Sequence, residues 1–265
     1  MNREVNRNMN SDTNSSEITL LEWLESGPFT LVMSSGFFGF YAHCGVLQAL
    51  ESVGVRPAGV AGSSAGALVG GCWAAGLSAD ELAEELIRLR RVDFWDPAPG
   101  LGFLRGRAFR AHLQAILPVK SFEECRAPVV MSVFDLLGMK TRVLSSGYLP
   151  GAIHASCAVP LMFHPVRVQG RLCVDGGVSD RPGIAGVRED GRVFFHHLAS
   201  RSPWRLRPPS IPRRAELVPL VINGLPRVDP FHLERGADAL RVARRETLKA
   251  FQLPLERFNH CLNKS

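Results

Sequence analysis

The chain has 265 residues, of which 46% are hydrophobic and 21% charged, a composition typical of a folded globular protein and not of a disordered one. Its formal net charge is +6, with a pI of about 9.3, which suits an anionic surface such as a phospholipid headgroup layer. No zinc-finger spacing, basic heptad helix or aromatic RNA-binding signature accompanies this charge, so nucleic-acid binding is not favoured. The six cysteines form no CxxC pair and indicate buried, reduced side chains.

The N-terminal stretch 1–16 has no apolar core, so it predicts a disordered segment and not a secretion signal. Two uncharged runs, 28–50 and 57–77, are as long as a membrane span, but glycines and polar residues interrupt both. Buried strand–turn–helix units explain them better. Residues 17–265 are therefore expected to form a single domain, located in the cytoplasm either free or peripheral to a membrane.

Apolar periodicity predicts the first elements. A buried strand at 28–35 precedes a helix at 41–54, and a second strand at 57–62 precedes a helix at 65–76. Strands and helices that alternate in this way are typical of α/β folds, so a mainly parallel central sheet is expected.

The rest of the chain combines shorter elements with loops. Residues 93–107, rich in Pro, Gly and aromatic residues, predict a loop near the site. The segment 201–214 holds five arginines and four prolines and predicts a linker or lid, which either docks on anionic lipid or is a solvated loop. Strands are expected at 127–136 and 140–147, a short helix at 152–163, a hairpin at 166–177 and an amphipathic terminal helix at 235–252.

The stretch GVAGSSAGALVGG, residues 59–71, places two adjacent serines between the second strand and the second helix. A nucleophile elbow requires G-x-S-x-G, because the serine occupies a strained turn where flanking side chains would collide. Only Ser64 satisfies this pattern, through Gly62 and Gly66, since Ser63 lies between alanines at the equivalent positions. Ser64 would also stand at a helix N-terminus, which favours developing negative charge. Taken alone, the pentapeptide is equally consistent with a plain small-residue turn.

A second glycine-bearing turn, Ser34–Gly39 with the sequence SSGFFG, follows the first strand. Its spacing suits a loop whose backbone N–H groups point at an anion, such as the oxygen of a tetrahedral intermediate, where one donor contributes about 3 kcal/mol. A dinucleotide-binding fingerprint is the rival interpretation. It requires glycine at position 34 and an acidic residue at the end of the second strand, where this chain has Gly62 and Ser63.

Residues 31–78 resemble the opening of a patatin-like phospholipase domain, in which a glycine-rich oxyanion loop, a helix with H-x-G-V-L and a G-x-S-x-G elbow follow in this order. Residues 152–177, AIHASCAVPLMFHPVRVQGRLCVDGG, are similar to the family's A-S-x-A-x-P segment and its terminal D-G-G/A. The likeness covers about Phe29 to Pro182, with a further match in the tail LPRVDPFHLERGADAL. It implies a three-layer α/β/α sandwich and a serine acyl hydrolase.

The resemblance assigns Ser64 as the nucleophile and Asp175 as the base of a Ser–Asp dyad that works without histidine. Gly176 and Gly177 would permit the close turn that aims the carboxylate at the elbow. The family implies no metal or cofactor, and its partner is a lipid ester at a membrane or micelle surface. The oxyanion would be held by backbone N–H groups of Ser35, Gly36 and Phe37, with Gly39 in a positional role.

Departures from the family pattern affect the loop and the turn after Asp175. Bacterial members commonly have G-G-G-x-R/K-G, whereas this loop has no Arg or Lys and looks more like the animal triacylglycerol-lipase branch, G-x-G-F-L-G, with Ser34 for the first glycine. Arg181 stands before Pro182, where the family often has Asn. Two alternatives therefore stay open: a catalytically weak or inactive lipid-binding protein, and a lipid transacylase.

The histidines offer an ordinary Ser–Asp–His triad as another alternative, because four of them follow Asp175 in the required order. His196 and His197 end an apolar strand, where adjacent side chains face opposite ways, so a shared metal ion is not expected. His43 is expected to pack on the first helix. The four histidines are His196, His197, His232 and His260.

Aromatic residues supply a candidate acyl channel, although such residues also serve as ordinary core. The headgroup, ester position, acyl length and oligomeric state are not encoded in any motif of the chain. The candidate channel residues are Phe37, Phe38, Phe40, Phe94, Trp95 and Phe103.

Overall fold

The structure, a computed structural model, describes residues 18–199 and 211–259. The expected N-terminal segment 1–16, residues 201–210 of the basic segment, and His260 lie outside the described residues. The main sheet has eight strands. They are β1 (Thr30–Met33), β2 (Gly59–Ser63), β4 (Val129–Asp135), β5 (Lys140–Leu144), β7 (Val166–Val168), β8 (Arg171–Asp175), β9 (Val193–His197) and β10 (Leu217–Val221).

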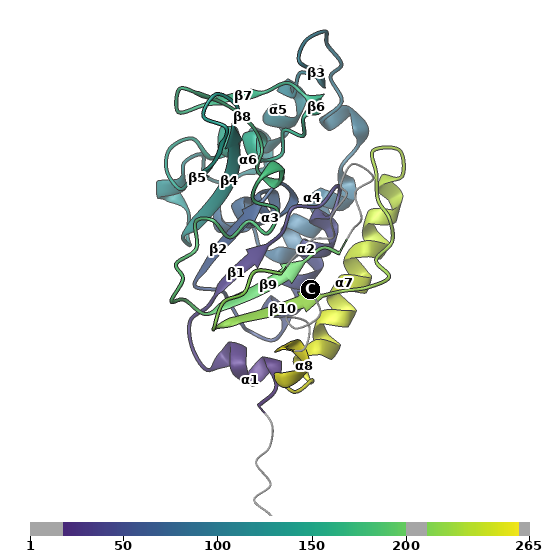
Figure 1. The fold of residues 1–265 in the computed structure, drawn as a ribbon. Helices are drawn as coiled ribbons and strands as arrows, with labels where there is room; N and C mark the ends of the chain where they lie inside the picture. The colour runs from purple at the N-terminus through teal and green to yellow at the C-terminus, as the bar shows by residue number, and fades with distance from the viewer. Residues whose placement is uncertain (1–17, 200–210, 260–265) are drawn as a thin grey trace, which may run out of the picture.

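The strand order is β10–β9–β1–β2–β4–β8–β7, and β5 pairs with β4 outside this path (Figure 1). The strands from β10 to β4 are parallel to their neighbours, whereas β5, β7 and β8 pair in antiparallel fashion. The predicted α/β class with a mainly parallel central sheet is confirmed. The predicted hairpin is also confirmed, since β7 and β8 are joined by Gln169 and Gly170, both with positive φ.

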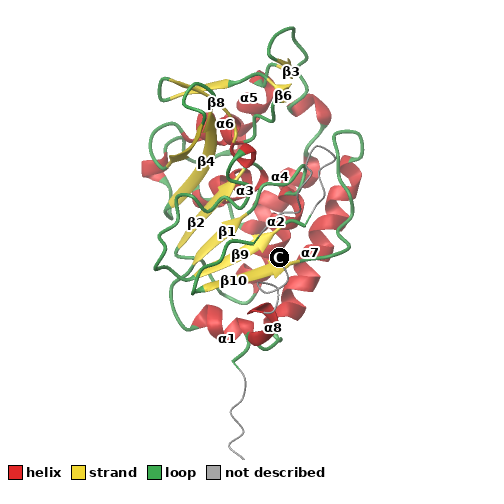
Figure 2. Ribbon diagram, in the orientation of Figure 1, coloured by secondary structure: helices red, strands yellow, loops and turns green. Residues whose placement is uncertain are grey.

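Helices connect these strands and gather mainly on one side of the sheet (Figure 2). No helix of the described ranges combines the length and the apolar character that a bilayer span requires. The helices are α1 (Leu20–Glu25), α2 (Phe40–Ser52), α3 (Ala65–Ala74), α4 (Ala79–Arg88), α5 (Arg107–Ile116), α6 (Leu149–Ser156), α7 (Gly236–Phe251) and α8 (Glu256–Asn259), with short 3-10 turns η1 (Arg91–Asp93), η2 (Phe122–Glu124), η3 (Gly176–Val178) and η4 (Leu233–Arg235).

Two expectations about the middle of the chain are wrong. The helix expected at 152–163 ends at Ser156, and Pro160 prevents its continuation. The chain instead forms β6 (Leu161–Phe163), which pairs with β3 (Gly102–Leu104) inside the stretch expected to be a loop. Helix α5 was not predicted, although its arginines and apolar residues alternate at helical spacing.

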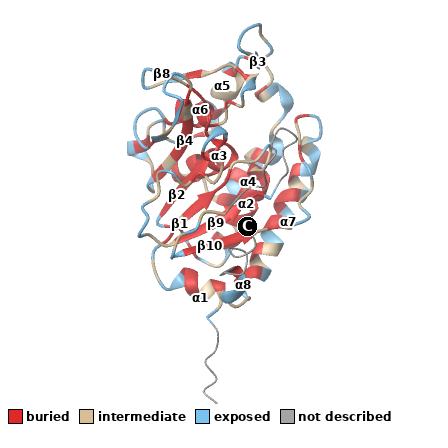
Figure 3. Cartoon of the chain, in the orientation of Figure 1, coloured by how far each residue is buried: buried red, intermediate tan, exposed pale blue. Residues whose placement is uncertain are grey.

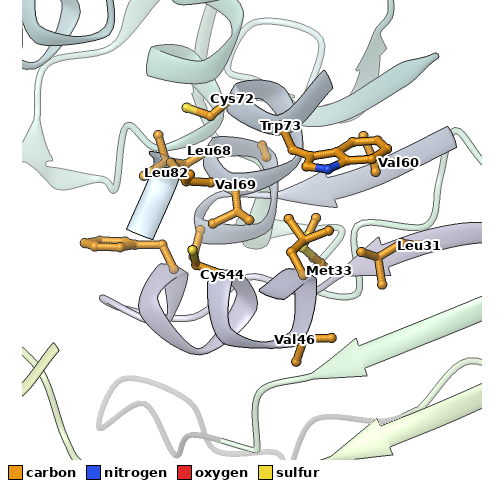
Figure 4. Close-up of a cluster of buried hydrophobic side chains, with 14 of the residues drawn as sticks. Leu31, Met33, Cys44, Val46, Val60, Leu68, Val69, Cys72, Trp73 and Leu82 are labelled. Atoms are coloured by element: carbon orange, nitrogen blue, oxygen red, sulfur yellow. The ribbon is translucent and has the colours of Figure 1, made fainter. Parts of the chain in front are cut away.

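Strand side chains alternate between the two faces of the sheet, and β2 and β9 are buried along their whole length (Figure 3). Leu31 and Met33 belong to the larger core under α2 and α3, where Figure 4 shows Met33 beside Val69 and Cys44. Val32 belongs to a smaller cluster on the opposite face.

That opposite face is covered by Ile184, Val187 and Ile211, which lie outside any helix. The resemblance implied helices on both faces. In the described part of the chain, the segment 180–192, DRPGIAGVREDGR, provides the second layer, because its proline and glycines do not sustain a helix.

Helix α7, in the stretch where a terminal helix was expected, packs along α2 through a glycine contact. A Cβ added at Gly45 would lie 2.4 Å from the carbonyl oxygen of Leu240 and 3.0 Å from the Cβ of Ala243. The two helix backbones can approach this closely only because position 45 has no side chain.

We expect Gly45→Ala to lower the free energy of unfolding by about 2 kcal/mol, because forcing α2 and α7 apart outweighs the roughly 1 kcal/mol that alanine gains over glycine within a helix. Urea denaturation followed by circular dichroism measures this change. Gly191→Ala is the matched control, since the atom nearest to a Cβ there is 3.7 Å away. Equal stability of the two variants would contradict the packing argument.

Candidate active site

Two strands end at neighbouring positions on one edge of β4. Parallel β2 pairs with the first half of β4 and finishes with Ser63 opposite Ser132. Antiparallel β8 pairs with the second half and finishes with Asp175 opposite Val133. Because β5 occupies the other edge of β4 over 131–135, β2 and β8 run toward each other along the same edge. Their C-terminal ends therefore meet.

Glycines make this meeting close. A Cβ at Gly176, which follows Asp175, would lie 2.1 Å from the carbonyl oxygen of Ser132 and 2.7 Å from the Oγ of Ser63. A Cβ at Gly183 would lie 2.7 Å from the backbone nitrogen of Ser63. The chain that leaves β8 consequently lies directly against the end of β2.

Ser64 occupies a strained turn between β2 and α3. Its φ of 54° and ψ of −115° lie in a region that costs a residue with a side chain about 1–3 kcal/mol. A Cβ at Gly62 would lie 2.5 Å from the carbonyl carbon of Gly66, and one at Gly66 would lie 2.0 Å from the carbonyl oxygen of Met33. The turn thus has the tight packing for which the G-x-S-x-G pattern is required.

Hydrogen bonds from the end of α6 support the turn at Ser64. The N–H of Ser64 donates to the Oγ of Ser156 at 3.0 Å, and that hydroxyl donates to the carbonyl of Ser132 at 2.7 Å. The thiol of Cys157 donates to the carbonyl of Ser64 at 3.2 Å. Ser156 and Cys157 belong to the A-S-x-A-x-P segment, and the sequence alone did not predict that this segment supports the elbow.

Asp175 is buried, with 5% of its surface exposed. Its N–H donates to the carbonyl of Ala158 at 2.9 Å, and its Oδ1 accepts the N–H of Gly177 at 2.7 Å. Burial and the charge of Asp175 raise the pKa of the Cys157 thiol well above its usual value. The Ser64 hydroxyl makes no hydrogen bond to the described residues, and its pairing with Asp175 stays a prediction.

A buried histidine pair anchors the loop after β1. The Nε2 of His43 lies 2.8 Å from the carbonyl oxygen of Ser34, and its Nδ1 lies 2.8 Å from the Nδ1 of His196. Because a carbonyl only accepts, Nε2 of His43 carries the proton and His196 donates from its Nδ1. Ser34 also donates its N–H to the carbonyl of His196 and accepts the N–H of Leu198. His43 does lie in α2, but the pair itself was not predicted.

The N–H groups of this loop have different partners. Ser35 donates to the carbonyl of Arg181 at 2.8 Å, so this N–H is not available to an oxyanion, in contrast with the expectation from the sequence. Among residues 18–199 and 211–259, the N–H groups of Gly36 and Phe37 have no acceptor. At Gly39, a Cβ would lie 2.1 Å from Cδ1 of Leu198, so a larger residue there would require the Leu198 side chain to shift.

Asp180 fixes the turn after β8 and was not singled out from the sequence. Its carboxylate accepts the hydroxyl of Ser132 at 2.5 Å and the N–H groups of Gly183, Ile184 and Ala185 at 3.0–3.2 Å. A buried carboxylate with this many donors serves to hold the turn. An Asp shortly before a Pro–Gly pair is a turn signal that could have revealed it.

Two of the three described histidines after Asp175 have hydrogen-bond partners elsewhere. His196 pairs with His43, and the Nδ1 of His232 lies 2.9 Å from an Oδ of Asp229. Burial, with Arg181 nearby, lowers the pKa of His197 to about 4. None of these three hydrogen-bonds Ser64, so the structure gives no support for a histidine triad.

An apolar cavity opens beside Ser64. It contains about 790 Å³ of space free of protein atoms, the part open to solvent included. Ser64, Leu68 and Cys72 lie on successive turns along one face of α3 and form one wall, and Figure 4 shows Leu68 beside Leu82 of α4. Phe37, Phe38, Phe40 and Phe94 line the cavity as expected, whereas Trp95 and Phe103 do not.

Comparison with known proteins agrees with this arrangement. A family model described as patatin-like phospholipase matches residues 31–187, more than half of the chain. The chain belongs to the patatin-like phospholipase family. The match includes the loop after β1, the elbow at Ser64 and the turn at Asp175 that the sequence motifs had indicated.

The chain spans only part of the length of its curated relatives. An uncharacterized NTE family protein of Mycobacterium tuberculosis is 38% identical over 167 residues, which are 60% of this chain and 46% of that protein. Lysophospholipase NTE1 of Cryptococcus neoformans is 26% identical over 168 residues, 61% of this chain and 10% of that protein. The chain therefore spans about half of the mycobacterial relative and a tenth of the fungal one.

The crystal structure of VipD from Legionella pneumophila is similar in fold, with a TM-score of 0.61 at 13% identity. The superposition covers 87% of this chain and 67% of that chain. The similarity of the loop to the animal triacylglycerol-lipase branch of the patatin-like family stays a prediction.

Acid is expected to destabilise this patatin-like fold through its histidine pair. Burial lowers the pKa of His43 from 6.5 to about 4 and that of His196 well below its usual value. The unfolded chain binds these protons near pH 6.5 while the folded chain does not, so the free energy of unfolding falls as the pH falls from about 6.5 toward 4. The slope is about 1 kcal/mol per pH unit for each histidine.

Urea denaturation at pH 7 and pH 5 tests this expectation with His43→Gln, which retains a donor for the Ser34 carbonyl. The variant should lose about 2 kcal/mol less stability between the two pH values than the native chain. His112→Gln, outside the pair, is the control. An unchanged pH dependence in His43→Gln would refute the assignment.

Proposed function

We propose that the chain is a serine lipid acyl hydrolase that cleaves fatty acyl esters through Ser64, Asp175 and an acyl-enzyme. The observation that carries this proposal is the meeting of β2 and β8 on one edge of β4, which brings the strained serine and the buried carboxylate to the same end of the sheet. Membership of the patatin-like phospholipase family and the lysophospholipase name of a relative support a lipid ester as the substrate.

In the proposed reaction, the Oγ of Ser64 attacks the ester carbonyl while Asp175 accepts its proton. The resulting oxyanion is stabilised by the N–H groups of Gly36 and Phe37 and by that of Ala65, the residue after the nucleophile. Ala65 opens α3, where first-turn N–H groups lack helical acceptors and the helix dipole favours negative charge. The alcohol leaves with the proton, and Asp175 then activates the water that releases the fatty acid.

The cavity is proposed to hold the acyl chain. Leu68 and Cys72 extend it along α3 away from Ser64, and Leu82 and Leu113, both fully buried, close it from α4 and α5. Each methylene group removed from water contributes about 0.8 kcal/mol. Binding energy should therefore rise with acyl length until the cavity is filled.

Adjacent serines supply a matched test of the nucleophile. Ser64→Ala is expected to abolish labelling by a fluorophosphonate probe and to lower hydrolysis of p-nitrophenyl butyrate by about a thousandfold or more. Asp175→Asn should lower both strongly because the serine then lacks its base. Ser63→Ala should retain both, since that hydroxyl is buried outside the cavity.

The proposal fails if Ser63→Ala loses activity while Ser64→Ala keeps it. Absence of probe labelling in the native chain would favour the lipid-binding alternative. Transfer of the acyl group to an added alcohol, in preference to water, would favour the transacylase.

Filling the far part of the cavity should alter chain-length preference. Cys72→Leu is expected to lower hydrolysis of p-nitrophenyl dodecanoate roughly 15- to 60-fold relative to p-nitrophenyl acetate, because two or three methylene groups lose their place. The acetate rate of the same variant is the internal control for folding and for the catalytic groups. An unchanged ratio of dodecanoate to acetate hydrolysis, with the acetate rate retained, would show that the long chain does not reach Cys72.

A further inference from the structure

A row of aromatic rings leads from the cavity toward the surface. Phe37 and Phe38 meet edge to face with ring centroids 4.9 Å apart, and Phe38 lies 5.8 Å from Phe94. Phe94 lies 6.4 Å from Trp95, which does not line the cavity. Trp95 therefore connects the residues that line the cavity to the aromatic residues at the surface.

Beyond Trp95 the apolar surface is exposed. Its ring lies 5.6 Å from Phe103 and 5.8 Å from Phe231, whose exposed fractions are 54% and 64%. Leu161, in β6, pairs with the residue before Phe103 and is 83% exposed. Single exposed apolar residues are common, but a group at a cavity mouth indicates a binding surface. We call Phe37, Phe103, Leu161 and Phe231 the apolar rim.

The backbone at Leu161 strengthens this interpretation. Its φ of 68° is a left-handed conformation that a leucine adopts only against strain. Glycine or asparagine would adopt it at lower cost and would expose no apolar side chain. Leu161 therefore presents a large apolar side chain at the rim at a position where a smaller or polar residue would cost less.

Positive charge accompanies the apolar rim. The Arg91 guanidinium lies 5.7 Å from the ring centroid of Trp95 and 5.6 Å from that of Phe231. Residues 90–110 contain five arginines and two aspartates. Asp96 accepts three backbone N–H groups at the start of α5, and Asp93 accepts the N–H of Arg90, so both acids are used within the protein. Residues 226–236, which include Phe231, contain two arginines and two acidic residues and therefore add no net charge.

We infer that the apolar rim docks on a lipid surface that contains anionic headgroups. Exposed aromatic and leucine side chains with arginine beside them fit the boundary between acyl chains and headgroups. Docking there would place the cavity mouth against the bilayer, so an acyl chain reaches Ser64 without crossing water. The inference rests on the proposed function, and it adds that the substrate is taken from a lipid bilayer.

The test is cosedimentation of the full chain with vesicles of phosphatidylcholine, alone or mixed with phosphatidylserine. Phe103→Ser/Phe231→Ser should lower partition into both vesicle types by about tenfold or more. Leu137→Ser/Met139→Ser is the matched control, because these residues are 78% and 72% exposed at the turn between β4 and β5. Arg91→Gln should lower binding to the mixed vesicles more than to phosphatidylcholine alone.

Hydrolysis of soluble p-nitrophenyl butyrate separates this inference from the proposed function. The rim double variant should retain that activity and lose hydrolysis of vesicle lipid in proportion to its lost binding. Equal vesicle binding by the two double variants, or none by the native chain, overturns the docking inference. A native dimer that the rim variant dissociates also overturns it, since the face would then join two copies. Rim-dependent vesicle binding without butyrate hydrolysis leaves docking intact and rejects the hydrolase.

Discussion

The head-on meeting of two strands along β4 is the constraint on which the candidate site depends. β2 and β8 run toward each other along one edge, so each must stop where the other stops, and both stop by turning sharply. β2 stops at the strained Ser64, and β8 stops where Gly176 packs on Ser132. A longer β2 or β8 would displace the other strand. The register of β4 therefore fixes the relation between the serine and the carboxylate.

Buried polar contacts give this junction its stiffness. The carbonyl of Ser132 accepts the hydroxyl of Ser156, which in turn accepts the N–H of Ser64. The hydroxyl of Ser132 donates to the carboxylate of Asp180. Ser132 of β4 thus stabilises the turn at Ser64 through its carbonyl and the turn after β8 through its hydroxyl. Such satisfied networks favour a single arrangement over near alternatives. They also compensate for the strain that the elbow imposes on the backbone.

The sequence predicted what depends on local pattern. Alternating strands and helices, the Gln169–Gly170 turn and the glycines around Ser64 each follow from short-range sterics. It did not predict that Ser35 donates its N–H to Arg181, because that bond joins segments far apart in the chain. Nor did it predict the pairing of His43 with His196, which requires the alignment of β9 beside β1. β6 was missed because its apolar residues 161–163 were assigned to the helix predicted at 152–163, although Pro160 favours a helix end before them.

The segment that follows β8 has three tasks at once. Its first glycines turn the chain at Asp175, its Arg181 carbonyl takes the N–H of Ser35, and Ile184 and Val187 cover the second face of the sheet. Beyond the short 3-10 turn η3 no helix lies in it, and the Asp180 carboxylate, which accepts three backbone N–H groups, is its main internal hydrogen-bond acceptor. Assembly of the candidate site is consequently cooperative, because releasing this one segment would detach the turn at Asp175, loosen the loop after β1 and uncover the sheet in a single event.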